Sequence, residues 1–306
     1  MYANVEMKIA AGNAVILDGG TGTEIQARGV AMDGETWCAE ANRTHPDVVR
    51  AVHEAYLAAG ADVITANTYA TSPILFYALG RQDEVGEIDR LAVRLARQAV
   101  ANAGAEQVAI AGSFSVMRPH KKGSDSGPAV AIPGKDLMPL FAKKAQGLAE
   151  SGCDLIIMEM MRDCDTSLWA TEAAVATGLP VWVGIAVERR ADGRLAGHSR
   201  PDWELPDIVT SLMSTGARAC LVMHNEIDLT EDALHIIKAN WAGPIGAYPE
   251  SGRFEMPNWT FGDISPADFV EQARRWRRIG ATILGGCCGI GPGHIKALAK
   301  AFGTHK

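Results

Sequence analysis

Two adjacent cysteines, Cys287 and Cys288, stand between glycines and follow the apolar run 281–284, which predicts a short buried strand. Neighbouring side chains of a regular strand point to opposite faces, so both sulfurs can reach one ion only where the strand gives way to a loop. The flanking glycines permit the unusual backbone that such a loop requires. Paired thiolates at a strand end predict a zinc site. Two inert buried cysteines are the alternative interpretation.

Catalytic zinc usually has three protein ligands and one open position. His224 follows another predicted strand, and its imidazole is a common metal ligand, so we predict it as the third ligand. Cys220 is the second candidate, because residues four positions apart in a strand share a face. His198, in a turn after the fifth predicted strand, is the third candidate.

Eight short apolar segments alternate with longer helical patterns along the 306 residues. This alternation predicts a parallel sheet, and eight such units are typical of a (β/α)8 barrel, here one domain over residues 1–306. An open, doubly wound sheet is the alternative. The predicted strands cover residues 14–17, 62–65, 108–111, 154–158, 181–185, 219–223, 244–247 and 281–284. The predicted helices include residues 46–59, 85–103, 136–151, 166–177, 204–214, 231–239 and 266–279.

In a parallel barrel, functional side chains gather at the carboxyl ends of the strands. Asp18 follows the first predicted strand, where its carboxylate can bind an ammonium group. Glu159 follows the fourth, and a carboxylate there is costly unless it is paired or faces a site. Gly19 belongs to a glycine-rich turn that lacks the lysine of a phosphate loop, and Asn67 follows the second strand. We predict that all four residues bind substrate.

Composition excludes several other classes of protein. Hydrophobic residues make up 47% of the sequence and charged residues 21%, so a sizeable core can form. The net charge of -7 disfavours nucleic-acid binding. No signal peptide and no apolar run of membrane-spanning length is evident. We therefore expect a cytoplasmic protein with reduced thiols, small-molecule partners, no nucleic-acid or membrane partner, and a monomeric or homodimeric state.

Four segments of the sequence resemble the zinc-dependent homocysteine S-methyltransferase family. They are residues 17–24, 59–69, 248–252 and 284–289, so the likeness spans nearly the whole sequence. The resemblance implies a (β/α)8 barrel with Zn²⁺ held by the cysteine pair and a third ligand after the sixth strand. It also implies that Asp18 and Glu159 hold the amino group of a homocysteine-like substrate. Trp37 resembles a family tryptophan near the methyl-donor site, where cation–π contact with an onium group is as plausible as core packing.

The implied reaction is methyl transfer from a sulfonium or quaternary ammonium donor to the thiol of homocysteine or a close analogue, which gives methionine. A zinc barrel with a hydrolytic, redox or metal-binding role is the alternative function. The sequence departs from the family at His224, where the family usually has a cysteine, and at Met160 to Asp163, where it usually has a threonine.

Two further features concern the space around the predicted site. Few aromatic residues other than Tyr69 and Tyr77 lie near the second strand, which disfavours a cage for a betaine donor. The irregular stretch 117–135 after the third strand predicts a lid over the site, with a disordered insertion as the alternative.

Overall fold

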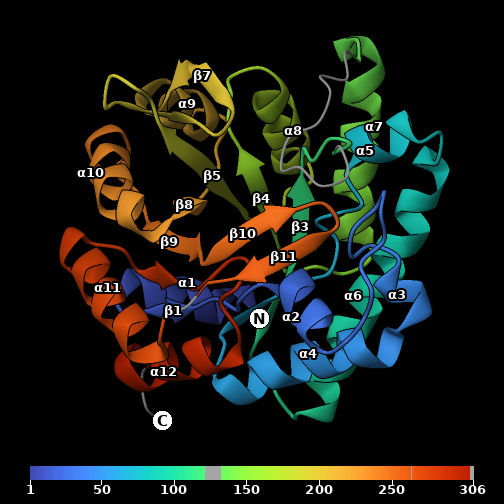
Figure 1. Ribbon diagram of the computed structural model, residues 1–306, viewed down its shortest axis with the longest axis horizontal. Helices are drawn as coiled ribbons and strands as arrows, with labels where there is room; N and C mark the ends of the chain where they lie inside the picture. The colour runs from blue at the N-terminus through green and yellow to red at the C-terminus, as the bar shows by residue number, and fades with distance from the viewer. Residues whose placement is uncertain (121–131, 263, 304–306) are drawn as a thin grey trace.

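The computed structural model describes residues 1–120, 132–262 and 264–303, and its centre is a ring of eight parallel strands (Figure 1). In sheet order these are β1 (Val15–Ile16), β12 (Ile283–Leu284), β9 (Ile245–Glu250), β8 (Ala219–Glu226), β5 (Val181–Arg189), β4 (Leu155–Met161), β3 (Ala109–Ser115) and β2 (Val63–Ala66). A bridge between Leu17 and Val63 joins β2 back to β1 and closes the ring. The predicted (β/α)8 barrel is therefore confirmed.

Helices surround the ring as an outer layer (Figure 1). Local sequence sets their ends: α4 (Pro46–Ala59) and α11 (Pro266–Ile279) each begin with proline and end at a glycine with positive φ, Gly60 and Gly280. The others are α2 (Thr21–Ala27), α3 (Ala41–Thr44), α5 (Pro73–Ala78), α6 (Val85–Asn102), α7 (Gly134–Glu150), α8 (Thr166–Val175), α9 (Leu205–Met213), α10 (Thr230–Asn240) and α12 (Pro292–Phe302). No helix in the described part of the chain combines the length and hydropathy of a membrane span.

The barrel interior is filled by side chains that alternate along the strands, and its amino-terminal end is closed by α1 (Tyr2–Ala10). Val5 of α1 packs into the interior cluster. The indole nitrogen of Trp182, an interior residue, donates a hydrogen bond to the Tyr2 hydroxyl at 3.1 Å. Because α1 blocks this end, a site inside the barrel can open only at the carboxyl ends of the strands.

Two antiparallel additions that the sequence did not predict follow strand ends. β6 (Leu195–Gly197) pairs with β5 and with β7 (Arg200–Glu204). β10 (Gly252–Glu255) and β11 (Asn258–Phe261) form a hairpin that lies across the mouth of the barrel (Figure 1). Trp259 anchors this hairpin, because its indole nitrogen donates to the Ser251 carbonyl oxygen at 3.2 Å. Of the predicted lid over 117–135, residues 121–131 lie outside the described residues.

A buried ion pair within the helical layer gives a prediction about stability. Lys144 and Asp89 lie 2.8 Å apart with side chains 0% and 1% exposed. Lys144→Met would leave the Asp89 carboxylate buried without its cation, so we expect the free energy of unfolding to fall by about 3–5 kcal/mol. The matched control is Lys143→Met, which breaks only an exposed pair with Asp83 and should change little. Urea unfolding curves measure the free energy of unfolding of both variants. An equal loss in the two would contradict a stabilising role for the Lys144–Asp89 pair.

Candidate metal centre and active-site cavity

A cavity of about 440 Å³ opens at the carboxyl ends of the barrel strands. Its lining includes every residue predicted for the site from the sequence, namely Asp18, Gly19, Trp37, Asn67, Glu159, His224, Cys287 and Cys288. His198 also lines the cavity, whereas Cys220 does not. The fold therefore brings together, at the carboxyl ends of the strands, residues that are far apart in the sequence.

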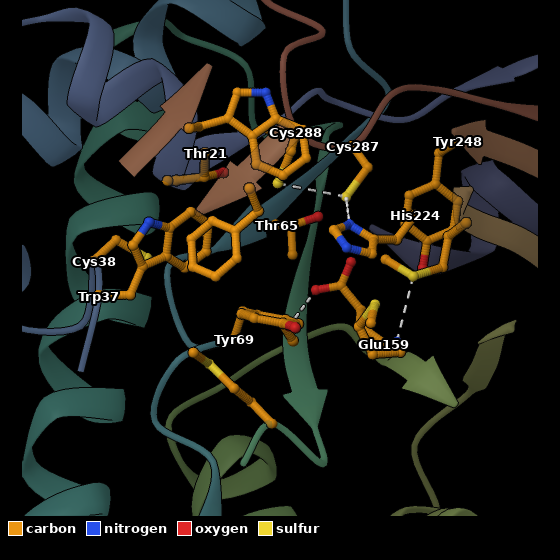
Figure 2. A pocket seen from close by; sticks show the side chains of 18 of the residues that line it. Thr21, Trp37, Cys38, Thr65, Tyr69, Glu159, His224, Tyr248, Cys287 and Cys288 are labelled. Carbon is orange, nitrogen blue, oxygen red and sulfur yellow. Dashed lines mark hydrogen bonds between the residues drawn. The ribbon is translucent and has the colours of Figure 1, made fainter. Parts of the chain in front are cut away.

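Cys287 lies between Cys288 and His224 (Figure 2). The two Sγ atoms are 3.9 Å apart, and Cys287 Sγ lies 3.7 Å from His224 Nδ1. One donor atom from each of the three side chains lies within 4.8 Å of the other two. Tetrahedral zinc, with bonds of about 2.3 Å to sulfur and about 2.0 Å to nitrogen, places such donors roughly 3.5–3.8 Å apart. The donor types and their spacing thus fit a zinc ion with one position left for another ligand.

His224 reaches the cavity because β8 is irregular at its end. Leu221 packs inside the barrel, whereas Cys220 packs against the helices, and in a regular strand His224 would share the side of Cys220. Instead, His224 has a φ of 46°, and the register between β8 and β9 shifts between Met223 and Glu226. The predicted shared face is therefore wrong: this bulge re-aims the imidazole, and Cys220 stays buried away from the cavity.

Glu250, at the end of β9, was not predicted as a site residue. Its Oε2 atom lies 2.7 Å from His224 Nδ1. Burial lowers the pKa of His224, but the Glu250 carboxylate and Cys287 more than offset this and hold the pKa well above its ordinary value. This is the same ring nitrogen that faces Cys287, so the carboxylate lies beside the candidate ligand atom itself and holds the ring towards the cysteine pair. The rule that selected Glu159, a carboxylate at the end of an apolar strand, would have selected Glu250 as well.

Two carboxylates stand on the cavity wall beside this cluster. Asp18 accepts hydrogen bonds from the Thr65 backbone nitrogen at 2.6 Å and from the Thr65 hydroxyl at 2.9 Å. Glu159 accepts one from the Ser113 hydroxyl. Burial raises the pKa of each carboxyl group to about 7, and the charge of Glu159 adds to the rise at Asp18. Two such groups on one wall favour a cationic ligand, such as an ammonium group.

Aromatic rings form another part of the cavity wall, and Figure 2 shows Trp37 and Tyr69 across the cavity from His224. The ring centroid of Trp37 lies 6.0 Å from that of Tyr69 and 5.9 Å from that of Phe254. Trp259 lies 6.2 Å from Phe254 and 6.0 Å from His224. Because Phe254 and Trp259 come from the β10–β11 hairpin, the aromatic count near the second strand was a poor guide to the cavity.

Asn67 and Gly19 line the cavity, but their contacts are with the protein. The Asn67 amide donates to the Cys38 carbonyl oxygen at 3.0 Å and to Asn42 Oδ1 at 3.2 Å, which secures the loop that carries Trp37. A Cβ atom at Gly19 would collide with the carbonyl oxygen of Ile290, so only glycine lets these backbones meet. Their substrate-binding role stays a prediction.

Relatives of this chain are known. A family model described as homocysteine S-methyltransferase matches residues 15–302. Homocysteine S-methyltransferase 4 of Zea mays is 28% identical over 312 residues, which cover 95% of this chain and 90% of that protein. Selenocysteine methyltransferase of Astragalus bisulcatus is 27% identical over 325 residues, which cover 96% of this chain and 94% of that protein.

Solved structures show the same fold. The homocysteine methyltransferase MmuM of Escherichia coli matches in its metallated form with a TM-score of 0.69 and 23% identity, over 94% of this chain and 96% of that one. Its oxidized form matches with a TM-score of 0.73 and 23% identity, over 94% of this chain and 95% of that one. With a family model that covers almost all of the barrel, the chain belongs to the homocysteine S-methyltransferase family and is a methyltransferase.

Proposed function

We propose that this enzyme uses a zinc ion at His224, Cys287 and Cys288 to transfer a methyl group from an onium donor to homocysteine or a close analogue. The single observation that carries the proposal is the His-Cys-Cys cluster in one cavity with the buried carboxylate of Asp18 and the partly buried carboxylate of Glu159. In the reaction, the bond from the methyl carbon to the donor sulfur or nitrogen breaks as its bond to the acceptor sulfur forms. The donor leaves neutral, the thiol proton is released, and methionine is the product with homocysteine.

The carboxylates of Asp18 and Glu159 would bind the ammonium group of the acceptor. Their hydrogen bonds to Thr65 and Ser113 fix where that group sits, so that the acceptor sulfur can point towards the cysteine pair. This positioning turns a bimolecular encounter into a reaction within one complex. A bound zinc ion would supply the positive charge that keeps the acceptor thiol deprotonated.

The aromatic wall suits the donor. Trp37 and Tyr69 line the cavity, and a sulfonium or quaternary ammonium group is attracted to the faces of such rings. Phe254 and Trp259 on the hairpin cover the cavity and would exclude water from the reacting sulfur. Sulfonium donors such as S-methylmethionine and quaternary ammonium donors such as betaine both meet this requirement.

The first test is the zinc content of protein purified under reducing conditions, measured by elemental mass spectrometry. About one zinc per chain is expected. The loaded protein should then form methionine from homocysteine with S-methylmethionine or glycine betaine. A chain that neither holds nor takes up zinc would overturn the proposal. Turnover that needs no added thiol would instead favour a zinc hydrolase.

Binding of the acceptor should weaken as the pH falls below about 7. Burial raises the pKa of Asp18 and Glu159 to about 7, so the negative charges that attract the ammonium group are present above this pH and are lost below it. We expect the inhibition constant of methionine, which has the amino group but no free thiol, to rise roughly tenfold per pH unit below about 6. 4-(Methylthio)butanoate differs from methionine only in lacking the amino group and is the control. A methionine constant independent of pH would contradict the role of the two carboxylates.

A further inference from the structure

Arg162 places a positive charge in the cavity wall, and no carboxylate of the described residues forms an ion pair with it. It follows β4 directly and is partly buried. In the part of the chain that the structure describes, its guanidinium makes one hydrogen bond, a long one of 3.5 Å from Nη1 to the carbonyl oxygen of His198. The adjacent carboxylate of Asp163 is engaged elsewhere, with Arg200 at 2.7 Å and the Ser167 backbone nitrogen at 2.8 Å.

The backbone holds Arg162 at this place. Its backbone nitrogen donates to the Ser167 hydroxyl at 3.1 Å. Just before it, Met160 has a φ of 59° and the register between β4 and β5 shifts, which marks a bulge. On the other side, a Cβ atom at Gly197 would collide with the Arg162 carbonyl group, so glycine is what allows the β6 backbone to approach. These contacts fix the backbone from which the Arg162 side chain extends.

Other cations stand on the same wall. Arg118 and Arg200 also line the cavity, and Arg200 is already paired with Asp163 and Asp202. Burial lowers the pKa of Arg162, and the positive charge of Arg118 lowers it further. A partly buried cation near like charges is unfavourable unless an anion joins it. We therefore expect the cavity to take a ligand with an anionic group.

We propose that Arg162 binds a carboxylate group of a substrate. This inference rests on the proposed function and names the chemistry of one more part of the same site. A guanidinium presents paired donors that match a carboxylate. Arg162 lies three residues after Glu159 in the sequence, so one strand end would hold the ammonium and the carboxylate of a zwitterion. An amino-acid acceptor and a zwitterionic onium donor both carry such a carboxylate.

Direct binding tests the inference without catalysis. Isothermal titration calorimetry would compare methionine with 3-(methylthio)propylamine, which lacks the carboxylate. We expect Arg162→Gln to weaken methionine binding roughly 30-fold and to leave the amine unchanged, and Arg162→Lys to restore part of the loss. The matched control is Arg189→Gln, which removes a surface pair with Asp232 outside the cavity. Equal weakening of both ligands, or of neither, by Arg162→Gln would overturn the inference.

Kinetics then assigns the carboxylate to one reactant. If it belongs to the donor, Arg162→Gln should lower kcat/KM with S-methylmethionine but not with trimethylsulfonium. If it belongs to the acceptor, the loss should occur with homocysteine but not with 3-aminopropane-1-thiol. The same loss with every pair of substrates would count against the inference. If the unmodified enzyme transfers no methyl group, the proposed function fails, but the calorimetric result still decides the role of Arg162.

Discussion

Replacing Cys287 with alanine is expected to abolish metal binding and methyl transfer together. Cys287 is the central member of the cluster, 3.9 Å from the sulfur of Cys288 and 3.7 Å from His224 Nδ1. Without Cys287 only the donor atoms of His224 and Cys288 remain, which are too few to hold zinc in dilute solution. Since a complete site of four ligands contributes about 10–16 kcal/mol, the loss of one thiolate should weaken zinc binding by about 100- to 1,000-fold. Competition with a chelator of known affinity measures this change, and methionine formation measures the rate.

The chain offers a matched control for this experiment. Cys164 is also a free, partly buried thiol, but it does not line the cavity. Cys164→Ala should keep one zinc per chain and the full rate, whereas Cys288→Ala should behave like Cys287→Ala. Zinc binding of ordinary affinity in Cys287→Ala would show that the ligand assignment is wrong.

Glu250→Gln is expected to lower zinc affinity about 10- to 100-fold, the usual effect of changing a residue that orients a metal ligand. The reason is the 2.7 Å contact between Glu250 Oε2 and His224 Nδ1, which fixes the ring beside the cysteine pair. Glu226→Gln is the control, because Glu226 is exposed at the end of the neighbouring strand and does not line the cavity. Equal zinc affinity in the two variants would argue against a role for Glu250.

Because Glu250 contacts residue 224, the effect of Glu250→Gln on zinc affinity should depend on which residue stands at position 224. His224→Cys would restore the ligand type usual in the family, but it would set a thiolate beside the Glu250 carboxylate, where like charges repel. We therefore expect His224→Cys to bind zinc less tightly than the double variant with Glu250→Gln. Glu250→Gln would thus weaken the site when residue 224 is histidine and strengthen it when residue 224 is cysteine. A change of the same sign in both backgrounds would contradict this coupling.

The sequence predicted the ring of strands well because parallel strands buried on both faces appear as continuous apolar runs. All eight predicted segments overlap strands of the barrel. It did not predict that β5 and β8 continue beyond their apolar runs, since polar residues such as Arg189 and Glu226 carry no such signal. The β10–β11 hairpin was missed for a related reason. Most of its residues are exposed, and it is anchored at Trp259, whose burial depends on tertiary packing.

The residues that line the cavity were predicted in part. Cys287 and Cys288 were singled out because adjacent thiols between glycines are a poor choice for packing, and both line the cavity. His224 was selected as a strand-end residue. The rule that residues four apart in a strand share a face also favoured Cys220, but it failed because β8 has a bulge that the local sequence does not predict. Phe254 reaches the cavity only because the hairpin folds back over the mouth. The single domain over residues 1–306, the cytoplasmic location and the monomeric or dimeric state stay predictions.

The cysteine loop is also part of the barrel wall. Its backbone continues the two-residue strand β12, because the nitrogens of Gly285, Gly286 and Cys287 donate to the carbonyl oxygens of Ala247, Asp18 and Pro249 at 3.1, 3.1 and 2.8 Å. An insertion or deletion there would open the ring. His224, in contrast, projects from a bulge outside the regular ladder, where one side chain can be exchanged without moving a strand. If the proposed metal site is correct, a substitution at position 224 changes its third ligand and its charge without disturbing the ring, whereas the cysteine pair is tied to the barrel by its backbone hydrogen bonds.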